Sequence, residues 1–582
     1  MKSITQIITD EVCAAIEEEG LGGILSDIEE VRFTKNAAHG DIQSNHAFDI
    51  GKKLQTNPRQ VANRVAQRLQ QRVDFARIEV AGPGFLNFFL HDDFLIQQAV
   101  AQVCDEHVGV LQSGKGKTMV IDYSSPNIAK RMHIGHMRST IIGNAIDRIY
   151  RSAGWNVIAD NHIGDWGTQF GKLIVAWDRD RDEEAFADDP IGELERLYVS
   201  FAQEATEEDM EKARQETVLL QQGDERNRGL WQQFIHESMK EFEKVYARLG
   251  ISFDVVYGES FYNEALAPLV EELDLHEISS VSDGAKVIAF GEDLQPKMLN
   301  NTVLIVQKAD GAFLYGTTDL ATLDFRRAEF SPHRIIYVTD LRQQLHFQQV
   351  FSSWKGLQEK RNVAPENLPE LIHIWFGMLK LDEGAMSSRK GNVIRLVDLI
   401  DEAVRRAQEV TDEKSSDFSS EERAQIAEAI GVSAIRYADL SQNPQTDVRF
   451  SWEKMLALEG NTAPFLMYSF ARAKGILRKA GMDTVCDVSK LSCGTAYERA
   501  LIFFLLRFPT AVEQALEQCK PNTLCDYLFE LCSVFNRFYV ECPVLSLEDE
   551  VLRMSRLALV EASLRVFQKC FSLLGIQALD RM

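Results

Sequence analysis

The 582-residue chain is too long for one hydrophobic core, which excludes a single-domain protein and predicts three or four domains. Its composition, 45% hydrophobic and 26% charged residues, is typical of a folded soluble protein and excludes a disordered chain. The formal net charge of −24 excludes nucleic-acid binding by bulk positive charge, so any RNA contact has to use a local surface.

The chain start and the cysteines indicate a cytoplasmic protein. The first 20 residues carry one lysine and many acids, and lack the basic start and apolar stretch of an export signal. The most apolar run, LIFFLLRFP, is interrupted by Arg507 and ended by Pro509, so it is too short for a membrane span. Seven of the nine cysteines follow residue 480 at irregular spacings, which favours buried thiols in a reducing compartment over zinc ligands or disulfides.

Three segments differ in their predicted elements. Residues 1–112 alternate helical stretches with the strand-like runs RIEVAG and GFLNFFL, which predicts an α+β N-terminal domain. Residues 113–435 alternate buried strands and helices, the sequence form of a Rossmann-like parallel sheet covered by helices. We interpret the acid-rich helical stretch at about 177–250 as an insertion between two halves of this sheet. Strand signals vanish after 436, so residues 436–582 are expected to be all-α.

Two histidines follow the first predicted strand of the middle segment, TMVIDYSS. In SSPNIAKRMHIGHMRST, His133 and His136 stand three residues apart at the start of a predicted helix. Imidazoles beside the free N–H groups of a helix start form a donor-rich site for phosphate oxygens, and Gly135 lets a nucleotide approach the backbone. The position after a strand, with Lys130 and Arg131 just upstream, favours this interpretation over an ordinary capped turn.

A second candidate for phosphate binding is AMSSRKGNV, residues 385–393, which follows the predicted strand LIHIWFGML. Its hydroxyls, cations and glycine suit the stabilisation of a leaving pyrophosphate. The residues are Ser387, Ser388, Arg389, Lys390 and Gly391. Alone, such a segment is typical of a solvated loop; together with the upstream histidines it becomes specific.

The pair HIGH (133–136) and MSSRKG (386–391) resembles the two nucleotide-binding motifs of class I aminoacyl-tRNA synthetases. The blocks DYSSPNIAKRMHIGHMRSTIIG, NHIGDWGTQFGKLI, FDVVYGESFY, LYGTTDLAT and LGIQALDRM resemble the arginyl-tRNA synthetases in particular. The resemblance implies activation of L-arginine by Mg·ATP and transfer from arginyl-adenylate to the 3′-terminal ribose of tRNA(Arg), with release of pyrophosphate and AMP. It also implies that tRNA must be bound for activation, and a monomer without a metal of its own, without DNA and without a membrane.

The resemblance assigns roles by matched position. The implied ATP contacts are His133, Gly135, His136, Ser387, Ser388, Arg389 and Lys390. The implied L-arginine contacts are Asp122, Ser125, Asn127, His136, Tyr315, Asp319 and Gln343, with Glu259 as a further acid. The implied catalytic groups are His133, His136, Lys130 and Lys390. Many class I enzymes carry a lysine where this loop has Ser388, and Lys390, Arg389 or Lys130 would supply that charge instead.

The charge of arginine also favours these contacts, apart from the resemblance. Arginine is a planar cation that keeps its proton, so a selective pocket needs a carboxylate for bidentate pairing and an aromatic face for stacking. Tyr315 and Asp319, four residues apart, share one face of a helical turn and provide both.

Residues 450–479 resemble the anticodon-recognising region of the family. Aromatic rings stack on unpaired bases and cations contact phosphates, although aromatics at helical spacing also suit a protein core. The implied tRNA contacts are Trp452, Phe465, Tyr468, Arg472, Lys474 and Met582. The N-terminal segment resembles the family's module for the tRNA elbow, for which the candidates are Phe85, Asn87 and Phe88, with a buried strand as the alternative.

Two alternative functions predict different sequence features. A catalytically silent relative that binds tRNA or senses arginine predicts a damaged ATP site, whereas both motifs are intact. A class I synthetase for another amino acid predicts a pocket without the pair of Tyr315 and Asp319.

Overall fold

The computed structural model describes residues 2–21, 30–34, 36–70, 72, 74–381, 394–414, 418–481 and 487–582. The chain forms two compact units. The first contains Met1–Gln112, Leu458–Leu573 and Gln577–Met582, and the second contains Ser113–Ala457 and Leu574–Ile576. The predicted fold class is confirmed, because a parallel sheet, an antiparallel α+β region and a helical C-terminal region are all present.

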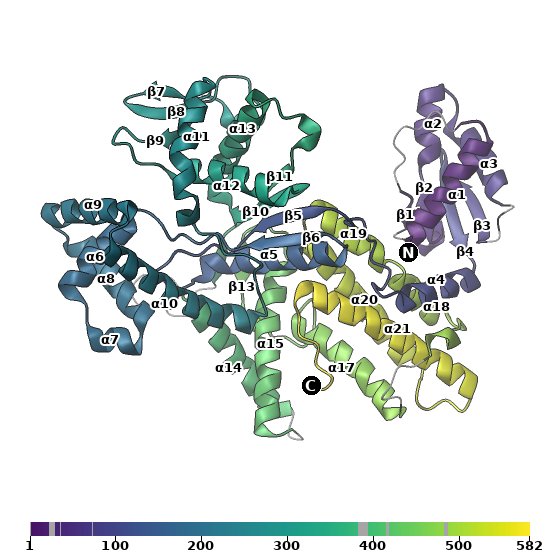
Figure 1. Cartoon of the computed structure of the whole chain (residues 1–582). Helices are drawn as coiled ribbons and strands as arrows, with labels where there is room; N and C mark the ends of the chain where they lie inside the picture. Colours follow the sequence, from purple (N-terminus) through teal and green to yellow (C-terminus); the bar gives the residue numbers. More distant parts are fainter. Residues whose placement is uncertain are drawn as a thin grey trace. The chain divides into compact units, whose positions relative to one another are not determined.

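A four-stranded parallel sheet of the order β11–β10–β5–β6 is the centre of the second unit (Figure 1). Its strands are β5 (Thr118–Asp122), β6 (Asn156–Asp160), β10 (Arg334–Asp340) and β11 (Glu370–Phe376). These are the apolar runs that the sequence predicts. Their carboxyl ends lie at one edge, where ligands of such sheets bind.

Helices cover both faces of this sheet (Figure 1). On one face, α12 (Tyr315–Phe330) and α13 (Gln344–Lys360) pack in a core with Val120 and Ile335 of the strands. On the other, α5 (Ile134–Ser152) approaches closely at Gly143, where a Cβ atom would lie 2.3 Å from the Cγ atom of Tyr123. The sheet therefore orients the start of α5 and the start of α12 towards the same edge.

The segment between β6 and β10 contains helices, including those of the stretch at about 177–250 where an insertion is predicted, and three strands that were not predicted. Its helices are α6 (Thr168–Asp180), α7 (Glu183–Asp188), α8 (Pro190–Glu204), α9 (Glu207–Gln222), α10 (Glu225–Leu249) and α11 (Asn263–Leu275). The strands β7 (Ser280–Ser282), β8 (Ala285–Ala289) and β9 (Val303–Gln307) form an antiparallel sheet. Since β7 and β9 alternate only weakly between apolar and polar residues, their periodic signal is small.

The second unit ends with α14 (Leu396–Lys414), α15 (Ser420–Leu440) and α16 (Trp452–Met455). The prediction that no strand follows residue 436 is wrong, because β13 (Val448–Phe450) pairs in parallel with β12 (Leu379–Leu381). A three-residue strand is too short to give a periodic signal, so only its tertiary partner reveals it.

The first unit begins with an antiparallel sheet of the order β1–β2–β4–β3. The elements are α1 (Ile4–Glu18), β1 (Arg32–Phe33), β2 (Ile42–Ser44), α2 (His46–Leu54), α3 (Pro58–Leu69), β3 (Phe75–Ala81), β4 (Phe85–Leu90) and α4 (Asp92–Cys104). Arg499, from the C-terminal part of this unit, donates to both carboxylate oxygens of Asp41, at 2.8 and 2.9 Å. The N-terminal and C-terminal parts of the chain thus contact each other within the first unit.

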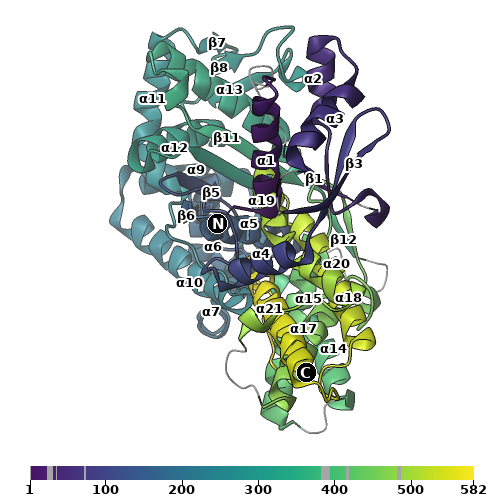
Figure 2. The same cartoon turned by 90° about the vertical axis from the view of Figure 1, so that its right-hand side faces the viewer.

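The C-terminal part of the first unit is a set of packed helices. They are α17 (Ala463–Lys479), α18 (Ala496–Leu505), α19 (Phe508–Gln518), α20 (Asn522–Glu541) and α21 (Glu550–Leu574). Helices α17 and α20 lie beside α21 (Figure 2). Phe470 of α17 packs against Phe571 of α21, and Phe535 of α20 packs against Phe567 of α21. In the parts of the chain that the structure describes, no helix has the length and apolarity needed to cross a membrane.

The close contact of α5 with the sheet gives a stability prediction. Gly143→Ala places a methyl group against the buried ring of Tyr123, so we expect a net destabilisation of about 1–3 kcal/mol despite the better helix propensity of alanine. Gly229→Ala, in α10 with open space around it, is the matched control and should raise stability by up to about 1 kcal/mol. Thermal unfolding of both variants measures this, and equal midpoints would contradict it.

Candidate active site

The loop after β5 has an unusual backbone. Ser124, Ser125 and Ala129 have φ angles of 75°, 46° and 61°, in the left-handed region that side chains rarely adopt. The conformation is held by hydrogen bonds from the N–H of Ser124 to Ser139 and from the N–H of Ser125 to Asn161. Strained backbone of this kind is concentrated at functional sites.

His133 and His136 cap the start of α5 with their own side chains. The N–H of His133 donates to Nδ1 of His136 at 3.1 Å, and the N–H of Gly135 donates to Nδ1 of His133 at 3.0 Å. The two rings lie 4.0 Å apart, centre to centre. Because each Nδ1 accepts a backbone hydrogen, each neutral ring carries its proton on Nε2.

The surroundings keep both imidazoles neutral. Burial lowers the pKa of His136 to about 3, helped by His133 and Lys130. Burial also lowers the pKa of His133, and the nearby charges of Lys130 and Arg342 act in the same direction. Two neutral rings with Nε2–H groups are hydrogen-bond donors, which is the chemistry that phosphate oxygens require. Lys130 itself lies over the ring of Tyr198, at 4.3 Å.

The segment that follows the second motif is attached to the histidine turn. The N–H of Ile134 donates to the carbonyl of Ile394 at 3.1 Å, and the N–H of Leu396 donates to the carbonyl of Met132 at 2.8 Å. Ser387, Ser388, Arg389 and Lys390 lie outside the described residues. Beyond them, Arg395 forms an isolated antiparallel bridge with His133.

Asp122 is engaged inside the protein. Its Oδ1 accepts from the Ser125 hydroxyl at 2.9 Å, and its Oδ2 accepts from Arg326 at 2.6 Å. Arg326 is fully buried and also donates to Asp160, at 2.7 Å. Asp122 thus holds Ser125 rather than standing open to a ligand. Asn127 is exposed and forms a bridge with Gly164.

The side chains predicted for the guanidinium gather at the start of α12. Oδ2 of Asp319 pairs with Nε2 of His346 at 2.5 Å, and the ring of Tyr315 packs edge-on against His346. Tyr315 is 65% exposed, so its face is available, and with His346 and Arg342 it lines a cavity of about 310 Å³. His346 is not among the residues predicted from sequence, although it stands three residues after Gln343 in the run DLRQQLHF that resembles the family. Gln343 lies exposed before α13.

Glu259 completes an acidic cluster with Asp319 and Asp165. Burial raises the pKa of Glu259 to about 7, with His162 opposing the shift and Asp319 and Asp165 adding to it. Among the described residues, no lysine or arginine forms an ion pair with any of the three carboxylates. The cluster therefore favours a cation from outside the chain.

The predicted tRNA contacts are divided between surface and core. Tyr468 is 46% exposed, and Arg472 lies between its ring and that of Tyr539, at 4.8 and 5.2 Å. Phe465 is half-buried against Phe529. Trp452 is buried, with Arg406 over its ring, so it has little surface for a base. The remaining candidates are Lys474, which pairs with Asp580 at 3.7 Å, and the half-buried Met582.

The N-terminal candidates are mostly interior. Asn87 and Phe88 are buried in β4, where Asn87 accepts from Gln43 at 2.6 Å, and Phe85 packs against Phe48.

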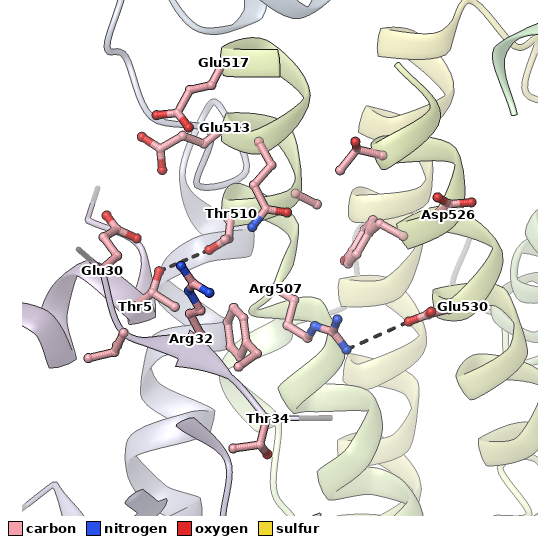
Figure 3. Close-up of a pocket in the computed structure, with 16 residues that line it drawn as sticks. Thr5, Glu30, Arg32, Thr34, Arg507, Thr510, Glu513, Glu517, Asp526 and Glu530 are labelled. Atoms are coloured by element: carbon pink, nitrogen blue, oxygen red, sulfur yellow. Dashed lines mark hydrogen bonds and ion pairs between the residues drawn. The ribbon is translucent and has the colours of Figure 1, made fainter. Parts of the chain in front are cut away.

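A cavity of about 940 Å³ in the first unit contains none of the predicted residues (Figure 3). Five carboxylates and two arginines line it, so its charge opposes phosphates. They are Glu30, Glu513, Glu517, Asp526, Glu530, Arg32 and Arg507.

Three family models match the chain. The catalytic domain of class I tRNA synthetases (R) matches residues 97–452, the arginyl-tRNA synthetase N-terminal domain matches 2–90, and the DALR anticodon binding domain matches 466–582. The arginine–tRNA ligase of Fusobacterium nucleatum is 45% identical over 559 residues, 95% of each chain. That of Shewanella sp. MR-4 is 39% identical over both full lengths. The crystal structure of the arginyl-tRNA synthetase of Plasmodium falciparum covers both chains completely, with a TM-score of 0.82 and 28% identity.

The parallel sheet, the histidine turn at a strand end and the matching catalytic model together define a class I tRNA synthetase, a class that uses ATP. The chain belongs to the arginyl-tRNA synthetases, the members of this class that act as arginine–tRNA ligases.

The environment of His136 predicts its titration. Since its pKa is about 3, the ring should stay neutral between pH 5 and 8, whereas histidine in an unfolded peptide titrates near pH ~6.5. Carbon-labelled histidine NMR, with His136→Gln for assignment, measures this. A His136 resonance that moves with a midpoint near that of the peptide would contradict the neutral donor.

Proposed function

We propose that the second unit activates L-arginine with Mg·ATP where β5, β6 and β10 end, and that the arginyl group then passes to the 3′-terminal ribose of tRNA(Arg). Family membership supports the reaction. The residue assignments rest on the acidic cluster of Glu259, Asp319 and Asp165. Among the described residues it pairs with a histidine, His346, but with no lysine or arginine, and it therefore suits a guanidinium.

The arginine side chain would enter between carboxylates and an aromatic ring. Asp319 would pair with the guanidinium, Tyr315 would offer its exposed face, and Glu259 would add a second negative charge once the cation has arrived. Ser125, held by Asp122, and Asn127 would bind the polar end of the amino acid, with Gln343 as a further contact.

The histidines would hold ATP. Their Nε2–H groups would donate to phosphate oxygens and to the charge that develops on the α-phosphate, and neutral rings can do this without losing a proton. Gly135 would face the nucleotide. Lys130 and the loop of 386–391 would complete the site, and Mg²⁺ would arrive with ATP rather than as a resident metal. Catalysis would rest on positioning and charge stabilisation.

The tRNA would be read by an exposed patch of the first unit. Tyr468, Arg472 and Tyr539 combine aromatic faces with a guanidinium, the chemistry that binds unpaired bases. Phe465 and Met582 would lie at the edge of this contact. Following the resemblance to the family, we propose that the enzyme acts as a monomer in the cytoplasm.

Removing the Asp319 carboxylate tests the assignment of the cation pocket. Asp319→Ala should raise the KM for arginine by about tenfold or more, because an ionic contact to the substrate is lost, and should leave the KM for ATP within about twofold. Glu329→Ala is the matched control, an exposed acid on the same helix. Steady-state aminoacylation measures both constants, and an equal rise for ATP would refute the assignment. Failure of the wild-type chain to charge tRNA with arginine would refute the function itself.

Glu259 gives a pH prediction. Its pKa of about 7 means that the free enzyme holds a proton there at pH 6 and has lost it at pH 8. A bound guanidinium favours the ionised carboxylate, so the KM for arginine should fall as pH rises from 6 to 8. Glu259→Gln should raise this KM and flatten its pH dependence. A slope that persists unchanged in the variant would assign the titration to another group.

A further inference from the structure

Arg326 is a buried guanidinium at the edge of the sheet where the site is built. Its exposed fraction is 0%, and its Nη2 donates to Oδ2 of Asp122 at 2.6 Å and to Oδ2 of Asp160 at 2.7 Å. Its guanidinium carbon lies 5.1 Å from the ring centre of Tyr337. A single nitrogen thus joins two carboxylates from neighbouring strands.

The three partners stand in one row across the sheet. Asp122 on β5 is in register with Asp160 on β6, and on its other side with Tyr337 on β10. Side chains in register on adjacent parallel strands point to the same face, so Arg326 lies across the row that contains the last residues of β5 and β6. Its place is therefore determined by the sheet itself.

Each end of this row leads to a segment of the proposed arginine pocket. Asp122 links Arg326 to Ser125, because one carboxylate oxygen of Asp122 accepts from Arg326 and the other accepts from the Ser125 hydroxyl. Through Asp160, Arg326 reaches the chain before Glu259, because Oδ1 of Asp160 accepts from the N–H of Tyr257 at 3.2 Å.

The third segment is the helix that carries Arg326. Asp319 lies seven residues earlier on α12, two turns away on the same side of the helix. The buried ion pairs therefore set how far α12 extends over the strand ends, and with it the position of the Asp319 carboxylate. Burying a charge is costly unless it is paired, and Arg326 pairs with two buried carboxylates at once, so both strands fix the position of its guanidinium.

We infer that Arg326 is a positioning residue for substrate arginine, a guanidinium inside the protein that aligns the three segments whose side chains form the pocket. It does not touch the substrate. It also occupies Asp122 and Asp160, so that incoming arginine is directed to Asp319 and Glu259. The inference rests on the proposed function of this site.

The test compares two buried arginines of the same unit. Arg326→Lys keeps the charge but cannot reproduce the guanidinium geometry, and Arg326→Met removes the charge. Arg436 is the matched control, because it is equally buried but bonds to Asn144, Leu249 and Leu574. The corresponding Arg436→Lys and Arg436→Met variants lose a buried guanidinium away from the proposed pocket.

Steady-state aminoacylation with the full chain and tRNA(Arg) should show a KM for arginine raised about tenfold or more in Arg326→Met, and less in Arg326→Lys. The KM for ATP should stay within about twofold in both, and the Arg436 variants should change neither constant. If Arg326→Met does not fold, the KM for arginine of Arg326→Lys tests the inference. The inference would be overturned by an unchanged KM for arginine, by equal rises in the KM for arginine and the KM for ATP, or by the same rise in the KM for arginine in Arg436→Lys. If the wild-type chain still charges tRNA with arginine, these outcomes leave the proposed function intact.

Discussion

The balance of charge where the parallel strands end governs what this edge of the sheet can bind. Asp122 and Asp160 share one buried arginine, whereas Asp319, Glu259 and Asp165 have histidines and hydroxyl or amide groups as neighbours. Since a buried carboxylate is costly without a counter-charge, the first set supports the architecture and the second set favours a cation from outside. Under the proposed function, this division would let a site rich in acids be both stable and selective for a permanent planar cation.

The nucleotide side of the site follows a different principle. His133 and His136 are held by backbone N–H groups on their Nδ1 atoms, and burial lowers the pKa of both rings. Donors that are already oriented and already neutral need no rearrangement when charge develops on a phosphate, which is the physical basis of electrostatic preorganisation. Hydrogen bonds also join residues 132–134 of this turn to residues 394–396.

An acidic protein that recognises tRNA has to use a local surface for the contact. The chain carries 24 more acidic than basic groups, and the cavity of about 940 Å³ in the first unit is lined by five carboxylates and only two arginines. The patch of Tyr468, Arg472 and Tyr539 provides stacking surfaces with a single guanidinium between them. Under the proposed function, such a patch would bind unpaired bases rather than a continuous phosphate backbone, and the family model for an anticodon binding domain supports this.

The sequence by itself determined the family, the parallel sheet and the place of the histidine turn, because periodicity and motifs are properties of neighbouring residues. Tertiary structure decided which side chains are available. It paired Asp122 with Arg326, 204 residues away, placed His346 beside Asp319, buried Trp452 and formed β13 against β12. The physical reason is that burial and ion pairing depend on partners distant in the chain. A local sequence pattern therefore does not show which carboxylates pair with a basic side chain of the protein and which have no such partner.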